Sequence, residues 1–590
     1  MKVSDYISHF LEINRISQVF AVTGGASLHL IHSIKKNKKI NIYFPIHEQT
    51  CSMAAEAYSR ISMKTGVAIA TSGPGATNLA TGISGAYFDS VPVMYITGQV
   101  STTRNKDGTG VRQIGFQETD CVSMFKPITK FAYKIKKSDE VPKILHKAFD
   151  IANTGRKGPV LIDIPDNIQR ENIKVTKKDI KKIDLIKKKI KPIKQNDLKK
   201  FFNLLKKSKR PVFIFGWGIH LSDSYKEAIQ IIKKTGLPFV TTWALAHLLP
   251  QSNKYKIGTW GTHGTRFANF AVQNADLIIS IGSRLDTKAT GSPVNTFARG
   301  AKKIMIDIDK NEINKFQKFD LKIDLKLNTD AKYFLQQIIN KKHININKKE
   351  IAKWINQIKK WKQAYPILKP DYLKQQSINP YFFIDTLSKC SLNDSIISVD
   401  TGCSIAWTMQ AFIFKNKQRL FHDFNNTAMG WSIPAAISFA LHSKKQIIVI
   451  IGDGSLSFML NELSFISEYK LPIKIFLLNN KGHSMIKQTQ DQWLNSEYFG
   501  SSHKGGLAKI NFIKVAQSFG LKTFNIRGSK NLEQNLINVF KDNKPSLCNV
   551  VIGENQRVIP QVKFGKPNED PEPLLDRNEF YKNMIIKPIS

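Results

Sequence analysis

The amino-acid sequence predicts an α/β protein with three doubly wound parallel-sheet domains in series. Short aliphatic runs alternate with amphipathic segments and glycine turns, which is the pattern of parallel βα units. This alternation occurs in three separate series along the chain. The length points the same way, because 590 residues are too many for one hydrophobic core and require several units of ordinary domain size.

The three series define the expected domain boundaries. The first runs from about residue 20 to 165, the second from 211 to 309, and the third from about 395 to 553. Lysine-rich stretches separate them, and charge runs of this kind are typical of linkers and exposed helix faces. We therefore expect a first domain at 1–170, a lysine-rich linker at 171–196, a central domain at 197–345, a linker at 346–375, a third domain at 376–555 and a C-terminal tail at 556–590.

Composition argues against several classes of protein. The longest aliphatic run, residues 447–451, is far too short to span a bilayer, and the N-terminus lacks the apolar stretch of a signal peptide. We therefore expect a cytoplasmic protein with no membrane partner. The five cysteines are scattered without a CxxC pair, which argues against a disulfide framework and a zinc site.

The formal net charge of +42 raises the question of nucleic-acid binding. The charge is mostly lysine in residues 174–200 and 341–362, and no aromatic stacking platform or base-reading motif accompanies it. We expect a solvated surface and no nucleic-acid partner. A basic nucleic-acid-binding protein stays as the alternative from another class.

The motif that carries the chemistry lies in the third domain, at the ends of two predicted strands. One strand runs into Gly452-Asp453-Gly454-Ser455, and the next ends at Asn480. Glycines let backbone approach a diphosphate, and Mg²⁺ prefers hard oxygen ligands in octahedral order. Either motif alone is a common turn, but the pairing at strand ends is specific. The sequence predicts metal ligation by Asp453, Asn480 and the Gly482 carbonyl, and cofactor contacts from Gly452, Gly454 and Ser455.

This pairing resembles the diphosphate-binding signature of thiamine-diphosphate (ThDP) enzymes. In the first domain, His47-Glu48-Gln49 followed by AAEAYSR resembles the activating-glutamate segment of that family. The resemblance implies that Glu48 hydrogen-bonds N1′ of the aminopyrimidine ring, a role suited to a carboxylate in a mostly apolar cleft. Without that context, a His-Glu pair at a helix start is usually a cap or surface charge.

Longer blocks are similar to the catalytic subunits of acetohydroxyacid (acetolactate) synthases. They include residues 71–100, 115–120 and 258–269, and the similarity runs block by block from about residue 5 to 555. It implies decarboxylation of pyruvate and transfer of the hydroxyethyl unit to a second 2-oxo acid, with ThDP, Mg²⁺ and FAD as cofactors. It also implies a homodimer or tetramer in which Glu48 of one chain faces the Asp453 motif of another, and it leaves a regulatory subunit open.

The resemblance also assigns roles to individual residues. Arg284 would face the acceptor carboxylate, as suits a planar bidentate donor; contact with FAD or a surface ion pair is the alternative. Met429 would press beneath the thiazolium ring. The other expected catalytic residues are Gly24, Gly25, Gln117 and Lys130, and the other expected ThDP contacts are Thr71, Asn78, Ala428 and Gly430. The expected FAD contacts are Gly216, Gly218, Gly261, His263, Arg284, Asp307 and Asp309. Glycines and aspartates of this last set also occur in ordinary strand-end turns.

Several positions depart from the synthase pattern on the acceptor side. Thr262 and Thr489 stand where the family has methionine and tryptophan, and residues 402–407 replace the family's GQHQMW. These changes open volume and remove contacts that select small aliphatic acceptors. Two functions therefore stay open: an acetolactate synthase, or a synthase-like carboligase that transfers an acetaldehyde unit to a bulkier acceptor such as a nucleotide-linked keto-sugar. The C-terminal tail resembles, less specifically, the tails of carboligases of this second kind.

Overall fold

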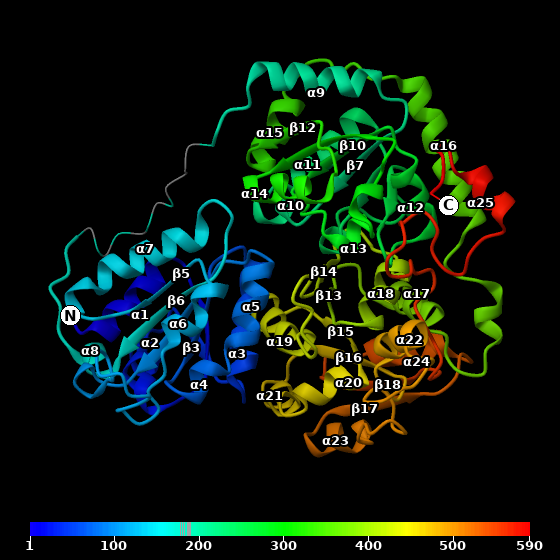
Figure 1. The fold of residues 1–590 in the computed structure, drawn as a ribbon. Helices are drawn as coiled ribbons and strands as arrows, with labels where there is room; N and C mark the ends of the chain where they lie inside the picture. Colours follow the sequence, from blue (N-terminus) through cyan, green and yellow to red (C-terminus); the bar gives the residue numbers. More distant parts are fainter. Residues whose placement is uncertain (178, 180, 182, 184, 186–189, 590) are drawn as a thin grey trace.

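The computed structural model describes residues 1–177, 179, 181, 183, 185 and 190–589. It contains three six-stranded sheets, all parallel, each covered by helices (Figure 1). The central strands are fully buried and rich in Val and Ile, as expected for parallel sheets covered on both faces. The predicted fold class is confirmed.

The first domain, at the left of Figure 1, has the sheet order β2-β1-β3-β4-β6-β5. The order reverses between β1 and β3, and parallel α/β sheets bind ligands beyond the carboxyl ends of the strands at such a switch point. Its elements are β1 (Gln18–Ala21), β2 (Asn41–Tyr43), β3 (Gly66–Ala70), β4 (Val93–Gln99), β5 (Phe131–Lys134), β6 (Val160–Pro165), α1 (Val3–Ile13), α2 (Leu28–Lys36), α3 (Glu48–Ser62), α4 (Pro74–Thr77), α5 (Ala80–Phe88), α6 (Cys121–Phe125), α7 (Val141–Asn153) and α8 (Asp166–Arg170).

The central domain, at the top of Figure 1, has the order β12-β11-β10-β7-β8-β9. Its switch point lies between β7 and β10, and this is the strand order found in dinucleotide-binding folds. Its elements are β7 (Pro211–Phe215), β8 (Phe239–Thr241), β9 (Lys256–Gly258), β10 (Leu277–Ile281), β11 (Lys302–Asp307), β12 (Leu325–Asn328), α9 (Gln195–Lys207), α10 (Gly218–Leu221), α11 (Tyr225–Thr235), α12 (Arg266–Gln273), α13 (Thr287–Thr290), α14 (Lys310–Asn314) and α15 (Ala331–Ile339).

The third domain repeats the strand order of the first, as β14-β13-β15-β16-β18-β17. Its switch point lies between β13 and β15, so residues that follow these strands are placed to bind a ligand. Its elements are β13 (Ile396–Val399), β14 (Arg419–Phe421), β15 (Ile447–Gly452), β16 (Ile473–Asn479), β17 (Lys522–Ile526), β18 (Ser546–Val551), α17 (Pro380–Cys390), α18 (Cys403–Ala411), α19 (Ser432–Ser443), α20 (Asp453–Leu456), α21 (Glu462–Glu468), α22 (Ser484–Trp493), α23 (Phe512–Ser518) and α24 (Leu532–Phe540).

The segment between the central and third domains differs from the expected linker at 346–375. It contains a long helix, α16 (Lys348–Ala364), whose buried Trp354, Ile358 and Trp361 belong to the core of the central domain. These residues recur at helical spacing and form an apolar stripe within a lysine-rich sequence. The lysines of the stretch suggested a linker, whereas the stripe between them makes it part of a domain. The other expected linker, 171–196, lies partly outside the described residues.

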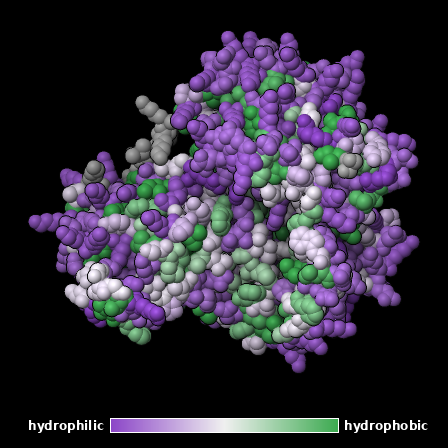
Figure 2. Space-filling view, viewed as in Figure 1, coloured by the Kyte–Doolittle hydropathy of each residue, from purple (hydrophilic) through white to green (hydrophobic). Residues whose placement is uncertain are grey.

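The C-terminal tail returns from the third domain to the central domain, beside α16 (Figure 1). Its helix α25 (Arg577–Asn583) buries Phe580 in the same core, and Nε1 of Trp361 donates a hydrogen bond of 2.7 Å to Asn583. The tail is therefore part of the packed structure. Hydrophilic side chains cover most of the visible face of the central domain in Figure 2. Lysines of α9 such as Lys199 and Lys206 are exposed to solvent.

A buried cation joins the domains. Arg60 of α3 is fully buried and donates to the carboxylates of Glu56 and Asp89 and, over 3.0 Å, to the carbonyl of His422 in the third domain. Nε1 of Trp431 donates to Glu56 over 2.6 Å, and Nε1 of Trp217, from the central domain, donates to the Asp89 carbonyl over 3.0 Å. Residues of all three domains thus meet around one guanidinium.

None of the described helices has the length and apolar character needed to cross a membrane.

Candidate active site

One part of the site is built around Glu48, the first residue of α3. His47 caps the helix, with its Nδ1 accepting from the Gln49 N–H over 3.1 Å, and Glu48 itself is half-buried. Oε2 of Glu48 accepts a hydrogen bond of 2.9 Å from the side-chain amide of Asn78. A Cβ atom at Gly75 would lie 3.3 Å from Oε1, so only a very small residue fits beside the carboxylate.

Most residues predicted in the first domain gather at the switch point of its sheet. A Cβ at Gly24 would lie 2.4 Å from Thr71, and Oγ1 of Thr71 accepts from the N–H of Ala26 over 3.2 Å. A Cβ at Gly73 would lie 2.9 Å from Cβ of Gln117, so the segment that carries Gln117 packs against the turn after β3. Gly25 faces open space, because nothing lies within 4 Å of a Cβ built there. The first domain therefore gathers small residues and Thr71 near Glu48 at the switch point of its sheet.

Lys130 lies elsewhere. Its Nζ donates to the carbonyl of Thr154 over 2.9 Å and to that of Ile151, at the C-terminal end of α7. These contacts direct the ammonium toward the helix end, where backbone carbonyls favour a cation. The structure does not bring the predicted Lys130 to the Glu48 group.

The second part of the site lies at the switch point of the third sheet. Asp453 follows β15, and its two oxygens accept from the N–H groups of Gly454 and Gly482, each over 2.9 Å. The bond to Gly482 ties the end of β15 to the turn after β16. Burial raises the pKa of Asp453 to about 6, against the two backbone hydrogen bonds that favour its ionised form. A Cβ at Gly454 would lie 2.6 Å from the imidazole ring of His483, so glycine lets this side chain lie close to the turn.

Asn480 provides the clearest sign of a bound cation. It is 5% exposed, and its Oδ1 has no hydrogen-bond partner. A buried acceptor without a partner costs free energy, and a hard cation would satisfy it. Within the described residues no group of three or more His, Cys, Asp and Glu side chains could hold a metal. The candidate donors here are the Asp453 carboxylate and the Asn480 amide, so a metal at this position would take most of its ligands from elsewhere.

Asp400, which the sequence analysis did not identify, organises the turn that carries Met429. It follows β13 and is fully buried, and its oxygens accept from the N–H groups of Gly430 and Ser432 over 3.1 and 3.0 Å. Thr427 and Gly430 both have positive φ, at 53° and 88°, so the turn is held in an uncommon conformation. The available signal was an aspartate directly after the strand that neighbours β15. Ala428 and Met429 are half-buried beside it.

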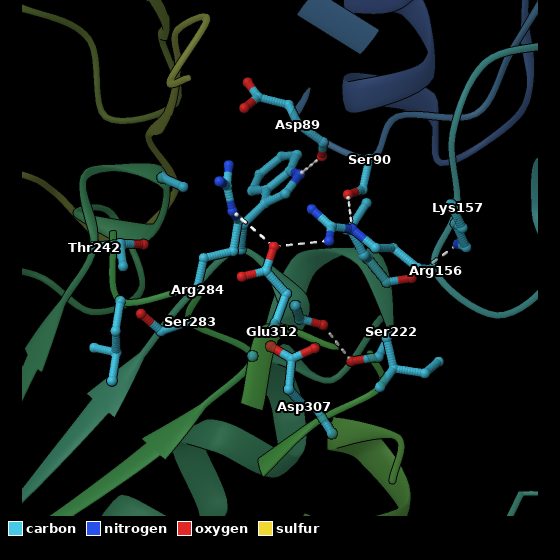
Figure 3. Close-up of a pocket in the computed structure, with 18 of the residues that line it drawn as sticks. Asp89, Ser90, Arg156, Lys157, Ser222, Thr242, Ser283, Arg284, Asp307 and Glu312 are labelled. Carbon is cyan, nitrogen blue, oxygen red and sulfur yellow. Dashed lines mark hydrogen bonds and ion pairs between the residues drawn. The ribbon is translucent and has the colours of Figure 1, made fainter. Parts of the chain in front are cut away.

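A cavity of about 750 Å³ lies at the junction of the three domains (Figure 3). A cluster of charges crosses it: Oε1 of Glu312 lies 2.8 Å from Nη1 of Arg156 and 3.2 Å from Nε of Arg284. Arg156 comes from the first domain and the other two from the central domain. Arg284 is thus in an ion pair, which was one of the alternatives to a contact with the acceptor.

Buried polar groups without partners surround this cavity. Both ring nitrogens of His263 and Nε1 of Trp260 lack hydrogen bonds, although both residues are less than 10% exposed. Burial lowers the pKa of His263 to about 4, so the imidazole is neutral. Burial raises the pKa of Asp307, which also lines the cavity, to about 6. Such a set of unsatisfied groups fits a large polar ligand.

The predicted flavin residues divide into two groups. Gly218, His263, Arg284 and Asp307 line the cavity. The remaining three support its walls. A Cβ at Gly216 would lie 2.4 Å from the Gly282 carbonyl, and a Cβ at Gly261 would lie 2.4 Å from the Lys288 carbonyl. Asp309 caps α14 and forms an ion pair of 2.9 Å with Arg156.

Comparison with known proteins assigns the family. Three family models match in the order of the three domains: the N-terminal TPP binding domain at residues 1–124, the central domain at 198–338 and the C-terminal TPP binding domain at 400–550 of thiamine pyrophosphate enzymes. The acetolactate synthase large subunit of Porphyra purpurea is 32% identical over 560 residues, covering 94% of this chain and 92% of its own length. The chain belongs to the acetolactate synthase large-subunit family of ThDP enzymes.

Other relatives support this assignment across distant organisms. The acetolactate synthase large subunit of Lactococcus lactis subsp. lactis is 32% identical over 96% of this chain and 95% of its own length. The probable acetolactate synthase large subunit of Methanocaldococcus jannaschii is 33% identical over 96% of this chain and 94% of its own length. The suspected family resemblance is confirmed, and it makes the chain a ThDP-dependent enzyme.

The family assignment gives meaning to the departures on the acceptor side. Thr262 lines the cavity, and its carbonyl accepts from the N–H of Val562 in the tail over 2.8 Å. Thr489 lies on α22, where its hydroxyl donates to the Met485 carbonyl over 3.1 Å. One turn later, Trp493 is 63% exposed, with its ring 4.9 Å from that of Phe564 in the tail. The tail therefore contacts two of the three segments in which this chain departs from the family pattern.

Proposed function

We propose that the chain is the catalytic subunit of an acetolactate synthase, which decarboxylates pyruvate and transfers the two-carbon unit to a second 2-oxo acid. The observation that carries this proposal is that relatives named for this activity align over 94 to 96% of the chain, and that both the Glu48 and the Asp453 groups are intact. Since the relatives named above are acetolactate synthases, they favour this function over transfer to a nucleotide-linked keto-sugar. They give no support to nucleic-acid binding.

Each group of the chain has a task in this reaction. When bound, ThDP supplies the electron sink that decarboxylation of a 2-oxo acid needs. Glu48 would exchange a proton with the cofactor ring, and Asn78 holds its carboxylate in position. Asp453, Asn480 and the Gly482 carbonyl would hold Mg²⁺, and the unpartnered Oδ1 of Asn480 supports this role. Asp400 fixes the turn that presents Met429, and the open space at Gly25 leaves room for substrate.

FAD is the ligand that we propose for the cavity between the domains. The volume of about 750 Å³, the dinucleotide-type strand order and the unsatisfied His263 and Trp260 support it. Gly218, Arg284 and Asp307 would hold it with His263. Flavin absorbance in the purified protein, or its appearance after reconstitution, tests this part. A protein that binds no flavin at millimolar FAD while retaining synthase activity would remove FAD from the assignment.

The active unit that we propose is a homodimer or a larger assembly of dimers. In the described residues no hydrogen bond connects Glu48 with Asp453 or Asn480, so a second chain is the natural source of the missing half of each site. Large apolar side chains are exposed in the first and third domains: the exposed fraction is 86% for Phe116 and 73% for Phe499. Sedimentation measurements test this, and a fully active monomer would contradict it. A regulatory subunit stays open.

Product analysis tests the function. Purified protein is incubated with pyruvate, ThDP, Mg²⁺ and FAD, and the products are identified by mass; a panel of 2-oxo acids, aldehydes and keto-sugars is then offered together with pyruvate. Formation of acetolactate, or of acetohydroxybutyrate with 2-oxobutyrate, is the expected result. The proposal fails if pyruvate is consumed without either product, and a product formed only with a keto-sugar would revive the alternative acceptor.

A further inference from the structure

A glutamate of the third domain holds the backbone that presents Glu48. Glu462 is the first residue of α21 and is fully buried. Its Oε1 accepts from the N–H groups of Ile46 and His47, each over 3.2 Å, and its Oε2 lies 3.3 Å from the Ile46 nitrogen. These are the two residues that immediately precede Glu48 in the first domain.

The chemistry of this contact is unusual for a buried carboxylate. Removing a charged group from water costs several kcal/mol unless hydrogen bonds compensate it. No ion pair of the described residues includes Glu462, and burial raises its pKa. The Thr50 side chain and the backbone N–H groups of Ile46 and His47, at the start of α3, stabilise its charged form instead. The positive end of the helix dipole adds to this, because it favours an anion at a helix N-terminus. A buried carboxylate that is hydrogen-bonded in this way fixes the geometry of its donors.

The donors concerned belong to the segment on which Glu48 depends. His47 is the N-cap of α3, and Ile46, although its side chain is 55% exposed, is held at its backbone by Glu462. Glu48 therefore begins its helix directly after two anchored peptide units. Its carboxylate is held at the other end by Asn78. Rotation of the peptide units at Ile46 and His47 would displace the carboxylate.

We propose that Glu462 is a positioning residue of the reaction: it fixes the backbone of Ile46 and His47 so that the Glu48 carboxylate is presented to the cofactor ring. This inference rests on the proposed role of Glu48. It also links two parts of the chain that act in catalysis, because Glu462 lies nine residues after Asp453 on the segment that leaves the metal-binding turn. A small misplacement of a catalytic group costs up to about 100-fold in rate.

The test combines a kinetic cycle with a measurement on the protein without cofactor. The variants are Glu462→Gln, which keeps the shape of the side chain but places an amide nitrogen among N–H donors, Glu48→Gln, and the pair combined. Glu468→Gln is the matched control, because Glu468 is an exposed glutamate at the other end of α21. Hydrogen–deuterium exchange is followed in peptides that contain residues 46–50, with no cofactor present.

We expect Glu462→Gln to lower kcat about 10- to 100-fold with a small change in KM. In the Glu48→Gln background the same substitution is expected to have little further effect, because its influence passes through Glu48. Amide exchange at residues 46–47 is expected to rise in Glu462→Gln and to stay unchanged in Glu468→Gln.

Unchanged kcat in Glu462→Gln would overturn the inference. So would an equal loss of kcat in both backgrounds, since that is the result of a general structural defect. If Glu462→Gln does not fold, the conservative Glu462→Asp is measured in the same cycle, and equal losses there count against the inference. Full activity of Glu48→Gln itself would instead contradict the proposed catalytic role of Glu48, whatever the exchange data on Glu462→Gln.

Discussion

The side-chain amide of Asn78 donates a hydrogen bond of 2.9 Å to Oε2 of Glu48. The bond links the first turn of α3 to the residue that follows α4, so both elements beside the switch point of the first sheet orient one carboxylate. A Cβ at Gly75 would lie 3.3 Å from the other oxygen, so a side chain at that position would crowd the carboxylate. The structure thus holds Glu48 in one orientation before any cofactor binds.

The first prediction concerns the charge of Glu48. Glu48→Gln keeps the shape and the neighbour Asn78 but removes the proton acceptor, and we expect kcat to fall at least about 100-fold. Steady-state rates and ThDP titration measure it, and ThDP affinity should change far less than kcat. Glu533→Gln, an exposed glutamate on α24, is the control. A Glu48→Gln enzyme with near wild-type kcat would remove Glu48 from the mechanism.

The second prediction concerns the metal. Asp453→Asn should raise the Mg²⁺ concentration needed for ThDP binding by about 100-fold or more, because a neutral amide replaces the only carboxylate of the predicted ligand set. The thermal shift produced by ThDP and Mg²⁺ reports binding without an activity assay. Asp371→Asn, at an exposed aspartate, should leave the shift intact. An unaltered Mg²⁺ dependence in Asp453→Asn would place the metal elsewhere.

The third prediction concerns the cavity between the domains. Gly282 has a φ of +59°, and its Cβ would lie 2.7 Å from the Cα of Gly218 at the switch point of the central sheet. Gly282→Ala should therefore push the two strand-end turns apart and weaken FAD binding at least about 10-fold; the strained backbone alone costs about 1–3 kcal/mol. Gly108→Ala has a similar φ, +80°, but no atom within 4 Å of the added Cβ, and isolates the effect of strain.

Flavin titration of both variants measures this difference. Equal FAD affinity in Gly282→Ala, Gly108→Ala and wild type would show that the close approach of the two turns does not shape the flavin site.

Patterns local in the sequence predicted the strands and the residues at their ends, including Asp453 and Asn480, whereas Glu48 was identified through the family resemblance. Strand ends are readable because burial, aliphatic runs and glycine turns are all local signals. Glu462 had no such signal, since its partner Ile46 is 416 residues away in the chain. Asp400 is an intermediate case, because its place after a strand was visible but its partners were not. The apolar stripe of α16 is present in the sequence at helical spacing, but the lysines between its members led us to expect a linker.

The fourth prediction concerns the junction around Arg60. Arg60→Met leaves the buried carboxylates of Glu56 and Asp89 without their cation, and breaking a buried pair in this way costs about 3–5 kcal/mol. We expect a marked fall in the thermal midpoint and weaker association of the first domain with the others, seen as earlier proteolysis between them. Arg104→Ala removes an exposed ion pair of 3.5 Å with Asp166 and should cost less than about 1 kcal/mol. Equal midpoints for the two variants would contradict the prediction.

The fifth prediction concerns pH and Lys256. Its side chain is 2% exposed, and its Nζ donates to the carbonyls of Ala246 and Leu249 over 2.6 and 2.8 Å. Burial, and then the nearby charge of Lys362, lowers the pKa of Lys256 from 10.5 to about 7. Below about pH 7 the folded and unfolded chains both carry the proton. Between about pH 7 and 10 only the unfolded chain keeps it, so the free energy of unfolding rises with pH, by up to about 1.4 kcal/mol per unit.

Lys256→Met removes this titration. We therefore expect the stability lost on substitution to be larger at pH 9 than at pH 6, by about 2–3 kcal/mol. Thermal midpoints of wild type and variant, measured side by side at both pH values, give the comparison. Lys199→Met, at an exposed lysine of α9, should show the same difference from wild type at both values. If the Lys256→Met difference is also independent of pH, then Lys256 keeps its proton in the folded chain across this range, and its two carbonyl partners hold it as a buried ammonium.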